Sequence, residues 1–234
     1  MNQELLNGQG AMRHQQVVEA IGRLVVGGGF GPQGQLPNEE ELCVRFEVSR
    51  TAIREAIKVL GAKGLLEARP RAGTRVRAFA HWSLFDADVL RWLGGAGMAQ
   101  QIAPHLTEMR EIIEPAAAGV AAKQATPAQQ VALAQAFQKM EAATCIDEWV
   151  AADLHFHQTI LQATNNPFLV ALGGMVGSAL EALLAVNAQQ ARAFNEALPG
   201  HRKVWAAIAA RDAEAASLWM RALLADTRAL LSVA

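Results

Sequence analysis

Apolar residues recur at helical spacing over most of this 234-residue chain, and only one stretch near residue 70 favours strands. Helices are predicted over about residues 13–27, over a short segment capped by Asn38 and over a longer one capped by Ser49. The runs "LLEAR" and "TRVR", separated by "PRAG", predict a two-stranded hairpin. Three helices and a hairpin in this order predict a winged helix-turn-helix domain over residues 1–78.

The pattern changes after this domain. Residues 79–97, "FAHWSLFDADVLRWLGGAG", are predicted to be a linker with a short amphipathic turn. Residues 98–234 show only helical periodicity, so the fold class is mainly α and the second domain is an all-helical bundle. Its helices are predicted over about 101–124, 127–143, 146–164, 167–192, 196–210 and 213–232. One of the predicted breaks is Leu198-Pro199-Gly200.

Composition indicates a globular protein, with 52% hydrophobic and 18% charged residues. The run 168–186 is long enough to span a bilayer, but Glu181 interrupts it and no basic cluster flanks it. The centre of a bundle or a dimer interface is therefore the favoured interpretation. The N-terminus lacks the apolar core of a signal peptide, and Cys43 and Cys145 lie far apart. We expect a cytoplasmic protein with no membrane partner.

Basic residues are concentrated in one region, although the formal net charge is −1. Residues 50–77 contain eight Lys or Arg against two acidic residues. Three basic side chains share one face of the helix that follows Ser49, and such a helix fits the major groove of DNA. A solvated basic face on an ordinary three-helix domain is the alternative. The residues predicted to contact DNA are Ser49, Arg50, Thr51, Arg54 and Lys58 on the helix, with Arg71 and Gly73 at the hairpin tip.

The stretch "LPNEEELCVRFEVSRTAIREAIKVLGAKGLLEARPRAGTRVR" resembles the DNA-binding domain of the GntR family of bacterial transcription regulators. The elements L-P-x-E-x-x-L, V-S-R-T-x-x-R-E-A, G-L-L and G-T-x-V all recur in register. Many members carry an arginine that contacts the DNA backbone directly after the glutamate of L-P-x-E. This chain has Glu40 at that position, so the resemblance implies that this contact is missing.

The segment "DLHFH" lies in the predicted helix 146–164. At 100° per residue, Asp153 and His157 fall inside the apolar arc, one turn apart, while His155 falls on the opposite face. A carboxylate buried among apolar groups needs a partner. An Asp–His hydrogen bond or a nearby arginine would satisfy it. A metal ion is the sharper alternative, since Asp and His at i, i+4 can share one ion.

Two further residues bear on this choice. His201 shares a helix face with apolar residues and is expected to point inward, which favours a shared metal ion. Arg110 borders the apolar face of its own helix and could hold a carboxylate by a forked pair of hydrogen bonds. The expected metal ligands are therefore Asp153, His157 and His201.

The C-terminal two-thirds resembles the FCD ligand-binding domain of the FadR-type GntR subfamily, through D-x-x-F-H, "ATNNPFL" and the run that begins at His201. The resemblance implies a divalent ion, zinc or nickel, and a small carboxylate effector held beside it, with Arg110 and Asn165 as effector-binding residues. Metal-binding members use a third His where this chain has Leu223. Three protein ligands leave positions that an effector's carboxylate and hydroxyl could fill. In its linker sequence and in the absence of this third His, the chain also resembles family members that respond to sugar acids.

These features together predict a homodimeric regulator, acting as a repressor, whose binding to operator DNA is controlled by a small carboxylate or sugar acid. A metal-dependent enzyme is the alternative from another class, because three ligands with open positions also describe catalytic zinc sites. The basic helix and the absence of a general base favour the regulator. A purely structural helical dimer would not need the basic helix.

Overall fold

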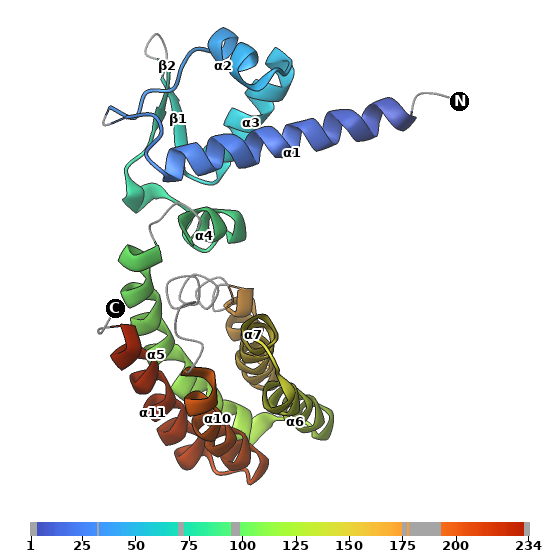
Figure 1. Ribbon diagram of the computed structural model, residues 1–234, viewed down its shortest axis with the longest axis vertical. Helices are drawn as coiled ribbons and strands as arrows, with labels where there is room; N and C mark the ends of the chain where they lie inside the picture. Colours follow the sequence, from blue (N-terminus) through green and yellow to red (C-terminus); the bar gives the residue numbers. More distant parts are fainter. Residues whose placement is uncertain are drawn as a thin grey trace. The chain divides into compact units, whose positions relative to one another are not determined.

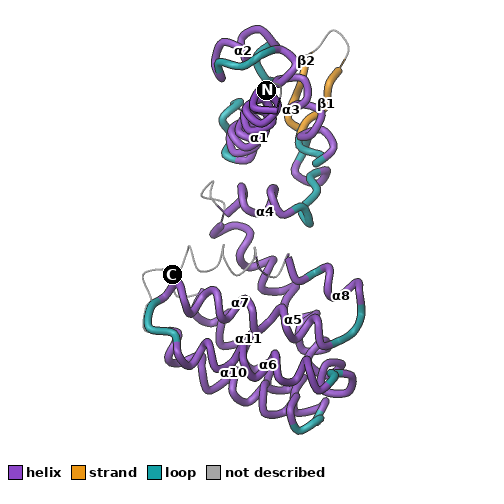
Figure 2. Tube along the Cα trace, turned by 90° about the vertical axis from the view of Figure 1, so that its right-hand side faces the viewer, coloured by secondary structure: helices purple, strands orange, loops and turns teal. Residues whose placement is uncertain are grey.

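The computed structural model describes residues 4–31, 33–69, 73–94, 99–174, 177 and 193–231. The chain divides into two compact units, Met1–Met98 and Ala99–Ala234. Figure 1 traces both units along the sequence, and Figure 2 shows that both strands of the described residues belong to the first unit.

The first unit has the winged helix-turn-helix fold predicted from the sequence. It contains α1 (Glu4–Val26), α2 (Glu39–Phe46), α3 (Arg50–Ala62) and the antiparallel pair β1 (Leu66–Arg69) and β2 (Gly73–Val76). α1 begins nine residues before its predicted start. Asn38 and Glu41 form a capping box on α2, and the Ser49 hydroxyl accepts from the Ala52 amide at 3.3 Å to cap α3.

The segment predicted to be a linker is packed into this first unit. It forms a short 3₁₀ helix, η1 (Phe79–His81), and the helix α4 (Ala87–Leu93). Trp92 of α4 is 1% exposed, and its indole nitrogen donates to a carboxylate oxygen of Glu19 on α1 at 2.8 Å. Lys63 lies within 2.9 Å of both Asp86 and Asp88. α4 is therefore attached to α1 and to the end of α3 by a buried indole and a chain of ion pairs.

The second unit is an all-helical bundle, which confirms the predicted fold class. Its described helices are α5 (Ala99–Gln124), α6 (Pro127–Ala142), α7 (Ile146–Ala163), α8 (Pro167–Ala171), α10 (Ala193–Ala209) and α11 (Ala213–Leu231). α5 lies alongside α11 and α7 alongside α6 (Figure 1). Their shared core contains aromatic and aliphatic side chains, including Phe137, Phe156, Ile160, Ile208 and Met220.

One predicted break is wrong. Leu198-Pro199-Gly200 lies inside α10 rather than ending a helix. A β-carbon on Gly200 would come within 2.9 Å of Leu223, so α10 packs closely on α11 at this point. Pro199 removes one backbone hydrogen bond, and packing of α10 on α11 supports the helix across it. For the predicted helix 167–192, α8 ends at Ala171, and residues 178–192 lie outside the described residues.

No helix among the described residues is both long and apolar enough to cross a membrane. Most of the apolar run 168–186 that raised this possibility lies outside them.

Candidate metal centre and DNA-contact surface

Three buried side chains converge in the second unit. Asp153 and His157 come from successive turns of α7, and His201 comes from α10. Asp153 Oδ1 lies 2.7 Å from His201 Nε2 and 3.5 Å from His157 Nε2. One ligand atom from each residue lies within 4.8 Å of the others. The inward orientation predicted for these residues is confirmed, as is the exposed position of His155 on the other face of α7.

The two imidazoles present the same nitrogen to Asp153. His201 Nδ1 lies 2.9 Å from the backbone carbonyl of Ala197, one turn earlier on α10. His157 Nδ1 lies 2.5 Å from Glu114 Oε2 on α5. When each Nδ1 carries a proton toward its oxygen, each Nε2 is left with a lone pair directed at the shared space. Metal-binding histidines are oriented by outer partners in this way.

These residues fit a divalent ion. Asp153 Oδ1, His157 Nδ1 and His201 Nε2 are all buried, and none of them has a hydrogen bond of acceptable geometry, although Asp153 Oδ1 and His201 Nε2 lie close together. Buried polar groups in this state need another partner. One carboxylate oxygen and two imidazole nitrogens are ligands that zinc and nickel accept. Leu223, at the expected fourth-ligand position, is 4% exposed within the core and offers no ligand atom.

Glu114 belongs to this cluster, and the sequence analysis missed it. Its carboxylate accepts from Arg110 Nε at 2.5 Å and contacts His157 on the other side. Arg110 and Glu114 are each 1% exposed, and Arg110 Nη2 lies 3.3 Å from His157 Nε2. The pair stands at i, i+4 on α5, which is the spacing of an ordinary surface ion pair. The one sequence signal for the burial of this pair is the apolar character of the residues around it.

The charges of the cluster stabilise one another. Burial opposes the ionised form of Glu114, but Arg110 and His157 outweigh it and lower the pKa of Glu114 to about 2. Burial likewise opposes the imidazolium, but the Glu114 and Asp153 carboxylates raise the pKa of His157 to about 9. Burial also disfavours the Asp153 carboxylate, and the two histidines still hold its pKa below the ordinary value. The ion-free cluster is thus a network of paired buried charges.

Asn165 lies apart from this network. It is exposed in the turn after α7, in a left-handed conformation with φ of 53°. Its amide nitrogen donates to the Gln124 carbonyl at 3.0 Å, and its oxygen accepts from Gln129 at 2.9 Å. The structure therefore gives Asn165 contacts that join the ends of α5, α6 and α7, and does not bring it to the metal ligands.

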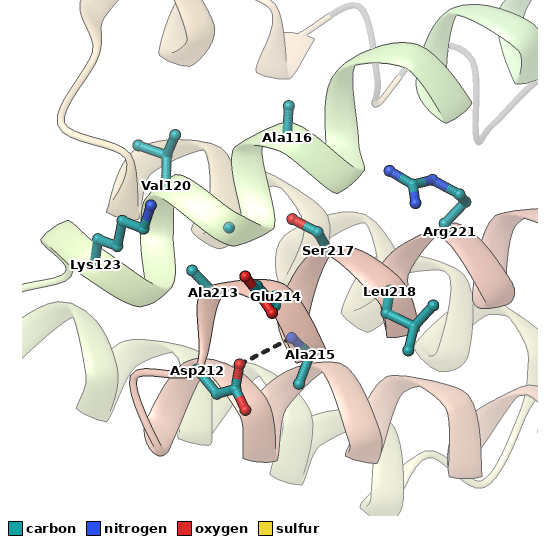
Figure 3. A pocket seen from close by; sticks show the side chains of 11 residues that line it. Ala116, Val120, Lys123, Asp212, Ala213, Glu214, Ala215, Ser217, Leu218 and Arg221 are labelled. Atoms are coloured by element: carbon teal, nitrogen blue, oxygen red, sulfur yellow. Dashed lines mark hydrogen bonds between the residues drawn. The ribbon is translucent and has the colours of Figure 1, made fainter.

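A surface groove of about 770 Å³ lies where α5 meets α11 (Figure 3). Lys123 and Arg221 flank it. Asp212 accepts from the Ala215 amide at 2.9 Å to cap α11, and Ser217 donates to the Pro115 carbonyl at 2.8 Å. None of the buried polar side chains of the described residues lines this groove. We therefore assign the chemistry of the second unit to the Asp153 cluster.

The predicted DNA-contact residues form an exposed surface on the first unit. Arg50, Arg54 and Lys58 follow one another along α3, with side chains 66%, 67% and 78% exposed. Thr51 is exposed beside Ser49 at the start of the helix, and Gly73 opens β2 with φ of 77°. Arg71 lies outside the described residues. The basic face is therefore accessible from solvent.

Two acidic residues of α2 lie against this basic face, which the sequence analysis did not anticipate. Arg54 Nε lies 3.0 and 2.9 Å from the two carboxylate oxygens of Glu39, and Arg50 lies 3.6 Å from Glu40. Both acids stand in the first turn of α2, where they also favour the helix macrodipole. The angle between α2 and α3 brings them to the arginines, and local sequence does not determine that angle.

Comparison with known proteins agrees with both halves of this description. Residues 13–76 match the model of the bacterial regulatory proteins of the gntR family, and residues 105–226 match the FCD domain. The Escherichia coli regulator YieP, of uncharacterised function, is 34% identical over 69% of this chain and 72% of its own length. The galactonate operon transcriptional repressor of Escherichia coli is 31% identical over 86% of this chain and 89% of its own.

A solved structure supports the fold. Lar, which controls the expression of the Listeria monocytogenes agr system, superposes with a TM-score of 0.64 at 20% identity and covers 94% of this chain and 96% of its own. The relatives found by sequence are transcription regulators rather than enzymes, so the enzymatic alternative is set aside. The chain belongs to the GntR family and is a DNA-binding transcription regulator with an FCD domain.

Proposed function

We propose that this regulator acts as a repressor whose affinity for operator DNA is controlled by a small hydroxy-carboxylate bound beside a divalent metal ion. The observation that carries the proposal is the convergence of Asp153, His157 and His201, with each Nδ1 lying close to an oxygen outside the site. This arrangement is costly to bury and suits metal binding. The repressor role is supported by similarity to the galactonate operon transcriptional repressor.

The DNA contact in this proposal is made by two copies of α3. GntR-type winged helices that pair as a homodimer would read a near-palindromic operator, one half-site each. Arg50 and Arg54 are placed at the exposed start and middle of α3, where they would reach guanine edges. Thr51, Lys58 and Gly73 would contact phosphates.

The metal in this proposal is zinc or nickel, held by three protein ligands. When bound, the ion would supply a Lewis acid that accepts a carboxylate and a neighbouring hydroxyl. Arg110 would take part of the effector's charge, because its Nη2 already lies beside His157. An aldonic sugar acid is the proposed effector. The name of the galactonate operon transcriptional repressor, which is 31% identical over 86% of this chain, supports this choice.

Metal analysis tests the centre. The wild-type protein should copurify or titrate with about one divalent ion per chain, and His157→Ala should lose it. His155→Ala is the matched control, because it removes an imidazole from the exposed face of the same helix. Equal metal content in all three proteins would exclude this centre. Selection of DNA by the purified protein, with and without aldonates, tests the regulatory half, which fails if no sequence is enriched.

A further inference from the structure

The net charge of the cluster limits which ligands it can bind, and this inference rests on the proposed function. The charged side chains found buried among the described residues are Arg110, Glu114 and Asp153, together with the imidazoles of His157 and His201. Arg110 and Glu114 are each 1% exposed, and Asp153 is 7% exposed. Solvent therefore screens these charges poorly, and their sum must be nearly balanced by whatever binds among them.

With a divalent ion in place, four groups set the net charge of the cluster that the described residues form. The ion contributes two positive charges and Arg110 one, while Asp153 and Glu114 contribute one negative charge each. Imidazole binds a metal ion as the neutral ring, and the site fits this form because each Nδ1 lies close to an oxygen outside it, the Ala197 carbonyl for His201 and the Glu114 carboxylate for His157. The loaded centre then carries one net positive charge.

We infer that the centre selects acids with a single carboxylate over acids with two, and that Glu114 sets this preference. A monoanion brings the buried charge to zero. A second carboxylate in the same site would leave one uncompensated negative charge, whose desolvation the remaining contacts do not offset. Without the Glu114 carboxylate the centre would carry two positive charges, and a dianion would become the balancing ligand. Glu114 acts through charge and contacts Arg110 and His157 rather than the ion.

The test uses an aldonate and the aldarate of the same six-carbon skeleton, which differ only in the oxidation of the last carbon. Isothermal titration of each acid into the full-length zinc-loaded protein gives the ratio of the two dissociation constants. The wild type should bind the aldonate about 10-fold or more tightly than the aldarate, since one unscreened charge exceeds the 1.4 kcal/mol of a tenfold ratio.

Four variants test how the net charge of the site affects the ratio of the two dissociation constants. Glu114→Gln keeps an oxygen beside His157 and adds one positive charge, so the ratio should reverse in favour of the aldarate. Arg110→Gln removes one positive charge, so both acids should weaken about 10-fold or more. The double variant restores the original sum and should restore the preference for the aldonate. Glu111→Gln is the control, because Glu111 lies on α5 but pairs with Arg228 at the surface, and its ratio should match the wild type.

Zinc content is measured in every sample, with zinc in excess so that a weaker site is filled. If the wild type binds neither acid, the proposed function is wrong. If it binds the aldarate as tightly as the aldonate, or if zinc-loaded Glu114→Gln keeps the wild-type ratio, the charge inference is overturned and the proposed function stands. If a variant fails to bind zinc, the ratio of the aldonate and aldarate dissociation constants of the wild type still tests the inference.

Discussion

Replacing Arg110 by Met should destabilise the second unit through an uncompensated buried carboxylate. Arg110 and Glu114 are each 1% exposed and lie 2.5 Å apart, so the substitution leaves Glu114 without its guanidinium and without water. Breaking a buried ion pair from one side costs about 3–5 kcal/mol. Glu114 keeps its contact with His157, so we expect the lower end, about 3 kcal/mol.

The matched comparison is the double substitution Arg110→Met with Glu114→Leu. Apolar residues of similar volume need no compensation, so the double variant should recover at least half of the lost stability. Arg228→Met serves as a surface control, because Arg228 is 54% exposed in its pair with Glu111 and should cost less than about 1 kcal/mol.

The assay is peptide-resolved hydrogen exchange of α5 and α7 in the presence of a chelator, which reports the unfolding free energy of the second unit alone. A loss below about 1 kcal/mol in Arg110→Met would refute the reasoning, as would a double variant as unstable as the single one.

Three further predictions concern the first unit. Arg54→Ala should cost about 1–3 kcal/mol in binding to the selected operator and little on unrelated DNA, measured by gel shift at fixed salt. The hydrogen bond from Arg91 lowers the pKa of Glu19 to about 2 from 4.5, so its stabilisation is complete above pH 4.5 and is lost as pH falls through 2. Glu19→Gln should therefore cost up to about 1 kcal/mol near neutral pH, and the cost should approach zero below pH 2, as measured by urea unfolding; a difference that stays constant with pH would contradict this. A β-carbon in Gly22→Ala would lie 2.5 Å from the Trp92 ring. The cost of this overpacking, about 1–3 kcal/mol, should exceed the gain of about 1 kcal/mol in helix propensity, so the variant should be less stable. A melting temperature above that of the wild type would disprove this prediction.

Most helices were predictable because their ends are determined by neighbours in sequence. Asn38 and Ser49 each cap a helix at the predicted position, since a cap needs only a side-chain oxygen and an amide two or three residues away. Pro199 shows the limit of this locality. Its sequence favours a break, and packing of Gly200 against Leu223 keeps the helix continuous.

The spacing of apolar residues is enough to predict which sides of the helices face inward. The 3.6-residue period places Asp153 and His157 on the buried face of α7 and His155 on the exposed one, and no knowledge of the neighbouring helices is needed for that. The exposed basic face of α3 follows from the same periodicity.

Which groups these inward side chains contact depends on how the helices pack against one another. Glu114 pairs with Arg110 at i, i+4, which is equally good on a helix surface, and its burial depends on the packing of α5 against α7 and α11. The contact between Glu39 and Arg54 depends in the same way on the angle between α2 and α3. Periodicity describes one helix at a time, whereas a partner across two helices depends on their crossing, which the packing of many side chains sets together.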